Sequence, residues 1–231
     1  MAPIAARQGP SAAGTCRKRD ASRKRPAAAG DGGKPLRRSA LPVLRPLSVR
    51  FAEPEERNVS ADWIVRRLRL EEGLRLRELR LRALARAPKA FGSTLAREEA
   101  FAPEVWHLRA ADGAAGLVSM TVVAEHGDRL VGMATGLVSD GEAQAFGPML
   151  VGMFVDDDMR RLGIGEALVE SVKTWASSRG HACLQLWVVS VNASAIALYR
   201  RCGFHASGAE RAVAHTPGLI EWQMLARLPA A

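Results

Sequence analysis

Residues 153–169 constrain the fold of this chain most, because they have the pattern of a strand, a tight turn and the beginning of a helix. Gly163 and Gly165 lie in the turn, where the lack of a Cβ lets the backbone approach a ligand closely. The start of the helix presents unpaired N–H groups and the positive end of the helix dipole, and Arg160 and Arg161 precede it. We therefore predict a phosphate-binding turn. The simpler alternative is an ordinary strand-to-helix turn.

Two other phosphate-binding loops fit this stretch less well. A dinucleotide-binding fingerprint needs a third glycine and an acidic residue about twenty positions further on. Leu168 stands at the third glycine position, and Gln185 and Trp187 stand where the acid is needed. A nucleoside triphosphate loop needs Gly-Lys-Ser/Thr, but Glu166 follows Gly165. Neither loop is therefore predicted.

A second motif lies at residues 192–204, after a predicted strand at 181–191. Its marked positions are Asn192, Ala195, Leu198, Tyr199, Gly203 and Phe204. Together the two motifs resemble the signatures of the GNAT N-acetyltransferase superfamily. The first matches Gln/Arg-x-x-Gly-x-Gly/Ala through Arg160, Gly163 and Gly165, and the second matches Asn-x-x-Ala-x-x-Leu-Tyr-x-x-x-Gly-Phe at every marked position.

This resemblance implies an α/β (α+β) domain with the GNAT fold over residues 61–231. Its centre is a mixed, mostly antiparallel sheet of about six to seven strands, flanked by about four helices. In that fold the fourth and fifth strands splay apart, and the pantetheine arm of acetyl-CoA lies between them, hydrogen-bonded to the backbone. The fourth strand here is predicted at 149–155. A helix pair and the loop at 87–94 would form one wall of the cleft for the acceptor.

The resemblance also implies which residues bind acetyl-CoA as cosubstrate. They are Met153, Phe154, Val155, Arg160, Arg161, Leu162, Gly163, Ile164, Gly165, Glu166, Asn192 and Tyr199. Asn192 can cap the following helix or bond the pantetheine arm, since its amide both donates and accepts. Tyr199, the only tyrosine of the chain, is the predicted catalytic residue, because a phenol can protonate or hydrogen-bond the departing thiolate. The alternative is a packed core tyrosine.

The implied activity is that of an acyltransferase. A primary amine of a small molecule, peptide or protein attacks acetyl-CoA directly in a ternary complex. Many relatives carry a glutamate on the fourth strand as base, but residues 149–154 contain no carboxylate. Glu142 and Glu221 are the remaining candidates, and the alternative for each is a solvated surface carboxylate. A non-catalytic acyl-CoA-binding sensor or partner protein is the alternative function.

The remaining elements follow from hydrophobic pattern and breaker residues. The expected strands lie at 62–70, 118–125, 129–138, 208–215 and 219–228, and the expected helices at 71–86 and from about 95 through 109. No metal site is predicted, because the histidines and cysteines lack zinc-site spacing and residues 156–158, three aspartates, have the character of a turn.

The net charge of +9 divides unevenly along the chain. Residues 1–50 hold 12 Lys and Arg against 2 Asp and Glu, so this tail is +10 and the remainder is −1. Six prolines and few apolar residues predict a disordered tail. It could serve as a targeting sequence or a weak contact to nucleic acid, or precede the true start of translation. Nucleic acid is not expected to bind the domain itself.

No segment approaches eighteen uninterrupted apolar residues, the length of a membrane-spanning helix. The basic N-terminus also lacks the apolar core of a secretory signal. We therefore expect a soluble cytoplasmic protein without a membrane partner, and we leave open a homodimer.

Overall fold

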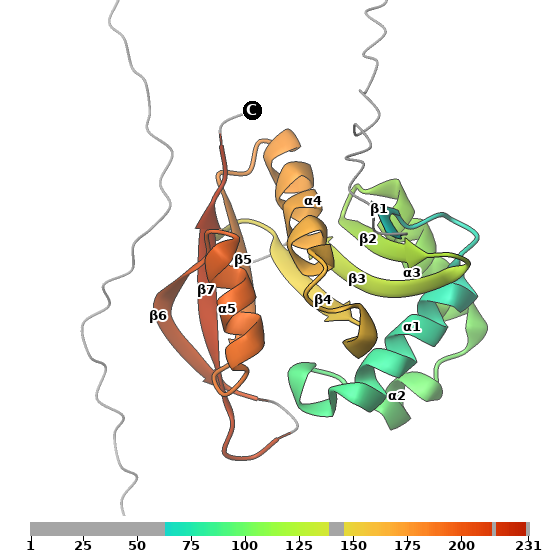
Figure 1. Ribbon diagram of the computed structural model, residues 1–231, viewed down its shortest axis with the longest axis horizontal. Coiled ribbons are helices and arrows are strands. Elements are labelled where there is room, and N and C mark those ends of the chain that lie inside the picture. Colours follow the sequence, from blue (N-terminus) through green and yellow to red (C-terminus); the bar gives the residue numbers. More distant parts are fainter. Residues whose placement is uncertain (1–62, 139–145, 214–215, 230–231) are drawn as a thin grey trace, which may run out of the picture. The chain divides into compact units, whose positions relative to one another are not determined.

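A seven-stranded sheet organises the computed structural model, which describes residues 63–138, 146–213 and 216–229 (Figure 1). The predicted tail and Glu142 lie outside these residues. The strands are β1 Trp63–Arg67, β2 Ser119–His126, β3 Arg129–Leu137, β4 Met149–Val155, β5 Cys183–Val189, β6 His205–Ala212 and β7 Ile220–Arg227. The described α-helices are α1 Gly73–Arg86, α2 Leu95–Glu99, α3 Pro103–Ala115, α4 Ile164–Ser178 and α5 Ala193–Arg201, with short 3-10 helices η1 Pro88–Ala90 and η3 Asp157–Met159.

The sheet is antiparallel except for the β4–β5 pair, and its strand order is β1-β2-β3-β4-β5-β7-β6. The parallel pair is joined in register at a single position, Met149 opposite Gln185. Beyond that point β4 and β5 separate, and Figure 1 shows the gap widening along their length. The predicted GNAT fold and its splayed fourth and fifth strands are therefore confirmed.

Two hydrophobic cores lie on opposite faces of the sheet. One contains the buried faces of α4 and α5, with Leu168 and Val172 fully buried. The other contains α1 and α3, with Leu79 and Trp106 fully buried. β2 supplies both cores from alternating positions, because successive side chains of a strand point to opposite faces. Helices thus cover both faces of the middle of the sheet. The uncovered region lies where β4 separates from β5.

The helix predicted from about 95 through 109 is wrong as a single element. The structure has two helices there, because α2 ends at Glu99 and α3 begins at Pro103. Proline is tolerated in the first turn of a helix but breaks its interior, so Pro103 begins a new one. Thr94 caps α2 by accepting a hydrogen bond from the Arg97 N–H at 3.3 Å. The break lets α2 and α3 point different side chains into one pocket.

Other predicted bounds shift by a few residues. β1 ends at Arg67 rather than at residue 70, and β6 begins at His205 rather than at 208. The Leu/Arg-rich segment is helical as predicted, in α1. Within the described residues, no helix is long and apolar enough to span a membrane.

A buried carboxylate joins β1 to α1. Glu72 is 4% exposed and accepts hydrogen bonds from both terminal nitrogens of Arg66 at 2.7 Å, from the Arg69 N–H at 2.9 Å and from Arg75. The hydrogen bonds from Arg66 outweigh desolvation and lower the pKa of Glu72 from 4.5 to about 2. Glu125 accepts further bonds from Arg66 and Arg75, so the arginines are not left with a single partner.

We expect Glu72 to contribute about 3 kcal/mol to the free energy of unfolding at neutral pH, from its lowered pKa. Because the folded-state pKa is depressed, this contribution is complete above about pH 4.5 and is lost as the pH falls to about 2. Glu72→Gln should therefore lower stability at pH 7 and flatten its decline over that pH range. Urea unfolding followed by circular dichroism measures both effects. The control is Glu78→Gln, whose carboxylate is 74% exposed. An unaltered acid dependence in Glu72→Gln would contradict the assignment.

Candidate functional site

A cleft of about 890 Å³ opens where β4 and β5 separate. Its walls are the C-terminal half of β4, the beginning of α4, the C-terminal half of β5 and one face of α5. We call it the β4–β5 cleft. Met153, Phe154 and Val155, which were predicted to bind the cofactor, line it from β4. With the two strands no longer paired to each other here, β4 can offer main-chain hydrogen-bonding groups to a ligand.

The turn between η3 and α4 forms one end of this cleft. Arg161 has a φ of +64° and Gly163, the N-cap of α4, has a φ of +84°. A left-handed conformation costs a non-glycine residue roughly 1–2 kcal/mol, so its presence at Arg161 marks a turn held in place by its surroundings. Such turns can gather successive N–H groups into an anion-binding concavity. The unpaired N–H groups of the first turn of α4 adjoin it.

The two arginines of this turn differ in whether they form an ion pair. Arg160 donates to the Val155 carbonyl at 3.1 Å and pairs with Asp157 at 2.6 Å. Arg161 has no ion pair among the described residues, so its charge is available to a ligand. Glu166, in the first turn of α4, is paired with Arg201 at 2.6 Å. The acidic side chains of this end of the cleft are therefore largely neutralised.

Tyr199 lies on the α5 wall of the cleft and is 8% exposed. Its ring packs against Phe204, with 5.9 Å between the ring centroids. Burial, and secondarily the nearby Cys202, raise the pKa of Tyr199 well above its ordinary value. The phenol is therefore protonated at neutral pH. No described residue forms a hydrogen bond with its hydroxyl, which leaves that donor free for a ligand.

Asn192 caps α5 with its side-chain oxygen, which accepts from the Ala195 N–H at 3.2 Å and from the Ser194 hydroxyl at 3.0 Å. Of the two roles that the sequence left open, the structure contains the cap. Its side chain also lines the β4–β5 cleft, where the amide nitrogen has no hydrogen-bond acceptor among the described residues.

The structure brings together every predicted cofactor-binding residue except Leu162 and Ile164. The side chain of Leu162 is 49% exposed outside the cleft, and that of Ile164 is buried in the core. Both alternate with glycines that do line the cleft. The sequence motif therefore specifies the course of the backbone along the cleft more than a set of side chains that face it. Ala87, Ala90 and Phe91 of the loop predicted as an acceptor wall also line this cleft. Further lining residues had no predicted role: Arg86, Trp187, Val188, Val189 and Arg201.

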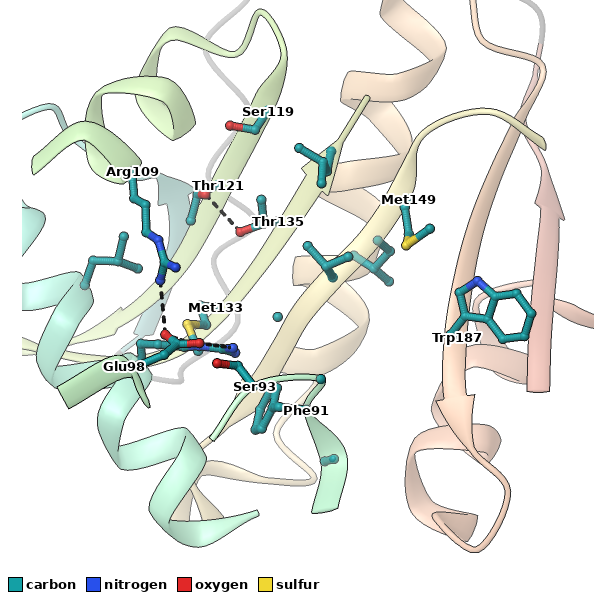
Figure 2. A pocket seen from close by; sticks show the side chains of 18 of the residues that line it. Phe91, Ser93, Glu98, Arg109, Ser119, Thr121, Met133, Thr135, Met149 and Trp187 are labelled. Atoms are coloured by element: carbon teal, nitrogen blue, oxygen red, sulfur yellow. Dashed lines mark hydrogen bonds and ion pairs between the residues drawn. The ribbon is translucent and has the colours of Figure 1, made fainter. Parts of the chain in front are cut away.

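A second pocket, of about 570 Å³, lies between the sheet and helices α1, α2 and α3 (Figure 2). We call it the helix-side pocket. It shares Ala90, Phe91 and Trp187 with the β4–β5 cleft. On β4, Gly152 lines the pocket and the next residue, Met153, lines the cleft. The two cavities therefore meet at this point of β4.

A β-bulge occupies the meeting point. Thr135 of β3 pairs with Val151, whereas Met133, two residues earlier, pairs with Phe154, so β4 has one residue more than β3 between the two pairs. Gly152 takes up the bulge with a φ of +65°, a conformation that favours glycine. A bulge leaves the extra residue out of the ladder. Backbone groups of β4 are thereby freed where the two cavities join.

Glu221, a candidate base from the sequence, lines the helix-side pocket from β7. It is 8% exposed and accepts a hydrogen bond from Arg211 Nε at 2.8 Å. The guanidinium of Arg211 in turn lies over the Trp187 ring, 4.2 Å from its centroid. Glu221 is thus a pocket carboxylate and not the solvated surface group that was its alternative.

The acetyltransferase (GNAT) family model matches residues 81–204 of the chain, which include the turn, the bulge and Tyr199. The chain belongs to this family. The matched GNAT segment runs from α1 through α5 to Phe204. It therefore contains β4, α4, β5 and α5, the elements that form the walls of the β4–β5 cleft.

Known proteins similar to this GNAT chain agree with the assignment. A stretch of 52 residues is 44% identical to an uncharacterized N-acetyltransferase of Methanocaldococcus jannaschii, and spans 22% of this chain and 23% of that protein. A GNAT-family acetyltransferase from Streptococcus pneumoniae superposes with a TM-score of 0.62 at 19% identity, over 72% of this chain and 99% of that one. An N-acetyltransferase from Thermoplasma acidophilum, solved in complex with coenzyme A, gives 0.54 at 15% identity, over 72% and 99%. The two solved structures share the fold.

Proposed function

We propose that this GNAT chain transfers the acetyl group of acetyl-CoA to a primary amine of a small molecule or peptide, by direct attack in a ternary complex. The observation that carries the proposal is the junction of two cavities at the Gly152 bulge. Two substrates can enter from opposite faces of the sheet and meet there. Holding two reactants in contact removes much of the entropic barrier to their reaction.

The chemistry of the β4–β5 cleft supports the binding of acetyl-CoA. The turn at Arg161 and Gly163 offers backbone N–H groups and one unpaired cation for the pyrophosphate. Unpaired backbone of β4 would bind the pantetheine amides. When bound, acetyl-CoA supplies a thioester whose carbonyl carbon accepts an amine and whose sulfur leaves as a thiolate. A backbone N–H at the bulge would polarise that carbonyl.

In this proposal Tyr199 stabilises the departing thiolate. A phenol with a raised pKa gives up its proton less readily than an ordinary one. A thiol, with an ordinary pKa of about 8.5, is the stronger acid of the two. We therefore assign Tyr199 the role of hydrogen-bond donor to the thiolate, in preference to complete proton transfer.

We further expect Glu221 to act as the base that takes a proton from the acceptor ammonium, directly or through water. Glu221→Gln should lower kcat/KM about 100-fold at neutral pH, within the range for loss of a general base. Acetyl-CoA affinity should not change, because Glu221 lies in the helix-side pocket and not in the cleft. Steady-state thiol release and calorimetry measure the two quantities. Glu210→Gln, at an exposed position on β6, is the matched control. Full activity in Glu221→Gln would remove Glu221 from this role.

Calorimetric titration of the full chain with acetyl-CoA, followed by thiol-release assays on a panel of amines, tests the proposed function. Binding with turnover on any amine would support acetyl transfer. Binding without turnover on any amine would favour the alternative of an acyl-CoA-binding sensor. Absence of binding would overturn the assignment of the β4–β5 cleft.

A further inference from the structure

One end of the helix-side pocket contains two arginines that share a single carboxylate. Glu98 of α2 accepts three contacts from Arg80 of α1, at 2.8 to 3.3 Å, and one from Arg109 of α3 at 3.1 Å. Figure 2 shows Arg109 and Glu98 joined at this end and Trp187 at the other. We call Arg80, Glu98 and Arg109 the arginine clamp. Because they come from three helices, the clamp also fixes the wall of the pocket.

The clamp carries a net positive charge. Glu98 is 2% exposed, and although burial alone would raise its pKa, hydrogen bonds from Arg80 and Arg109 lower that pKa below the ordinary value. The carboxylate is therefore ionised. With the guanidiniums of Arg80 and Arg109, the clamp has a formal charge of +1. The other acid–base pair of the pocket, Arg211 with Glu221, is balanced. Asp112, an exposed residue, also lines the pocket, and solvent screens its charge as it screens that of Arg109, whose side chain is 41% exposed. Arg80 is therefore the cation of the clamp that solvent screens least.

Arg80 directs an unused donor at the junction of the two cavities. Its Nε and Nη2 bond Glu98, whereas Nη1 has no hydrogen bond to a described residue. Nη1 lies 4.0 Å from the position that a Cβ on Gly152 would take. The guanidinium is held over the Phe91 ring, 4.6 Å from its centroid, and the side chain is 16% exposed. Nη1 is thus a fixed, poorly solvated cationic donor beside the bulge.

We propose that the acceptor is a free α-amino acid with an uncharged side chain, whose carboxylate binds Arg80. The inference rests on the proposed function. In an α-amino acid the amine and the carboxylate are attached to the same carbon, so a carboxylate at Nη1 of Arg80 places the amine at the bulge. Glu221 takes one proton from the ammonium, and the lone pair of the resulting amine bonds the acetyl carbonyl carbon. The thioester carbon–sulfur bond breaks with its electron pair on sulfur, and the second proton that the nitrogen loses passes to the thiolate, directly or through water. The products are an N-acetyl amino acid and coenzyme A.

Two features of the pocket favour this class of acceptor over other amines. A polyamine, a lysine side chain or a peptide N-terminus has no carboxylate next to its amine, and each would leave the clamp charge unmatched. The remaining lining offers apolar surface and hydroxyl groups for an uncharged side chain: Leu76, Trp106, Met133, Leu150, Ser119 and Thr121. The volume, about 570 Å³, lies in the usual range for small-molecule sites.

Matched acceptors test the proposal on the full chain. The panel contains the uncharged proteinogenic α-amino acids, their α-amides and the amines that remain after decarboxylation, for example L-phenylalanine, L-phenylalaninamide and phenethylamine. We expect kcat/KM of the best amino acid to exceed that of its amide and amine by about 100-fold, the worth of one charged hydrogen-bonded pair. Acetyl-CoA binding measured in parallel separates the two proposals. Lack of that binding refutes the proposed function itself. Binding with no preference for the carboxylate, or with no turnover of any amino acid, overturns only the acceptor class.

A charge-conserving variant locates the effect at Arg80. Arg80→Lys retains a cation for Glu98 but removes Nη1, so we expect the preference for amino acid over amide to fall at least tenfold while acetyl-CoA affinity is unchanged. The double variant Arg80→Gln/Glu98→Gln removes both charges of the pair together and should abolish the preference without stranding a buried carboxylate. Arg97→Lys, on the exposed side of α2, is the matched control. Circular dichroism verifies folding. A preference that survives both clamp variants refutes the role of Arg80.

Discussion

Tyr199→Phe is expected to lower kcat about 100-fold, the typical effect of losing a positioned proton or hydrogen-bond donor at a reacting atom. Its hydroxyl has no hydrogen bond to any described residue, so the substitution removes no contact within the protein. The ring remains packed on Phe204, and stability should not change. Acetyl-CoA affinity should also be retained, because the hydroxyl acts on sulfur only as negative charge develops there.

Single-turnover thiol release and calorimetry on the same preparation measure these two quantities for Tyr199→Phe. Because the raised pKa keeps Tyr199 protonated, the loss of kcat should be uniform from pH 6 to 9. Equal losses in kcat and in acetyl-CoA affinity would instead identify Tyr199 as a structural residue.

The second large effect is expected at Gly163. Gly163→Val should raise the Kd for acetyl-CoA about 100-fold, since the loss of one or two charged hydrogen bonds is worth several kcal/mol. The expected loss of affinity comes from the backbone conformation at Gly163 and not from steric crowding. No heavy atom lies within 4 Å of a Cβ built on Gly163, but its φ of +84° is one that a β-branched residue rarely adopts. The turn would rearrange, and its N–H groups would no longer converge.

Gly180→Val is the matched control for Gly163→Val, because Gly180 has a φ of +77°, has equally open surroundings and follows the other end of α4. Both variants should lose comparable stability, of roughly 1–2 kcal/mol. Only Gly163→Val should weaken acetyl-CoA binding. Equal affinities in the two variants would remove the turn from the binding site.

Gly163 and Gly165 differ in the atoms that a side chain at each position would contact. A Cβ on Gly165 would lie 3.1 Å from Leu198 of α5 and 3.5 Å from Met153 of β4. Gly165 therefore lets α4 approach α5 and β4 closely, in addition to any contact with phosphate. The motif combines two requirements, a left-handed turn at Gly163 and close packing at Gly165, which explains why both positions need glycine.

The splayed sheet and the β4–β5 cleft could be predicted through the resemblance to the GNAT family, because the two motifs that carry the resemblance are local and contiguous. A strand, a turn and a helix in direct succession bring Met153, Gly163 and Gly165 together. Their proximity does not depend on how the rest of the chain packs. Tyr199 follows from spacing within one short helix. The one large error was a single helix from about 95 through 109, which runs across Pro103, a proline that begins a new helix.

The two sequence motifs therefore determined the family, and they predicted the turn at Gly163 and Tyr199 as site residues, since each depends on residues that are neighbours along the chain. The resemblance implied that the helix pair and the loop at 87–94 form a wall of the acceptor cleft, but only the tertiary structure decided which side chains meet there. Arg80, Glu98 and Arg109 belong to three helices, and none of them has a sequence signal that marks it as a pocket residue. The bulge at Gly152 arises from pairing with β3, and Glu221 enters the pocket from β7. Side chains distant in sequence acquire a common function through packing, and local patterns carry no information about that packing.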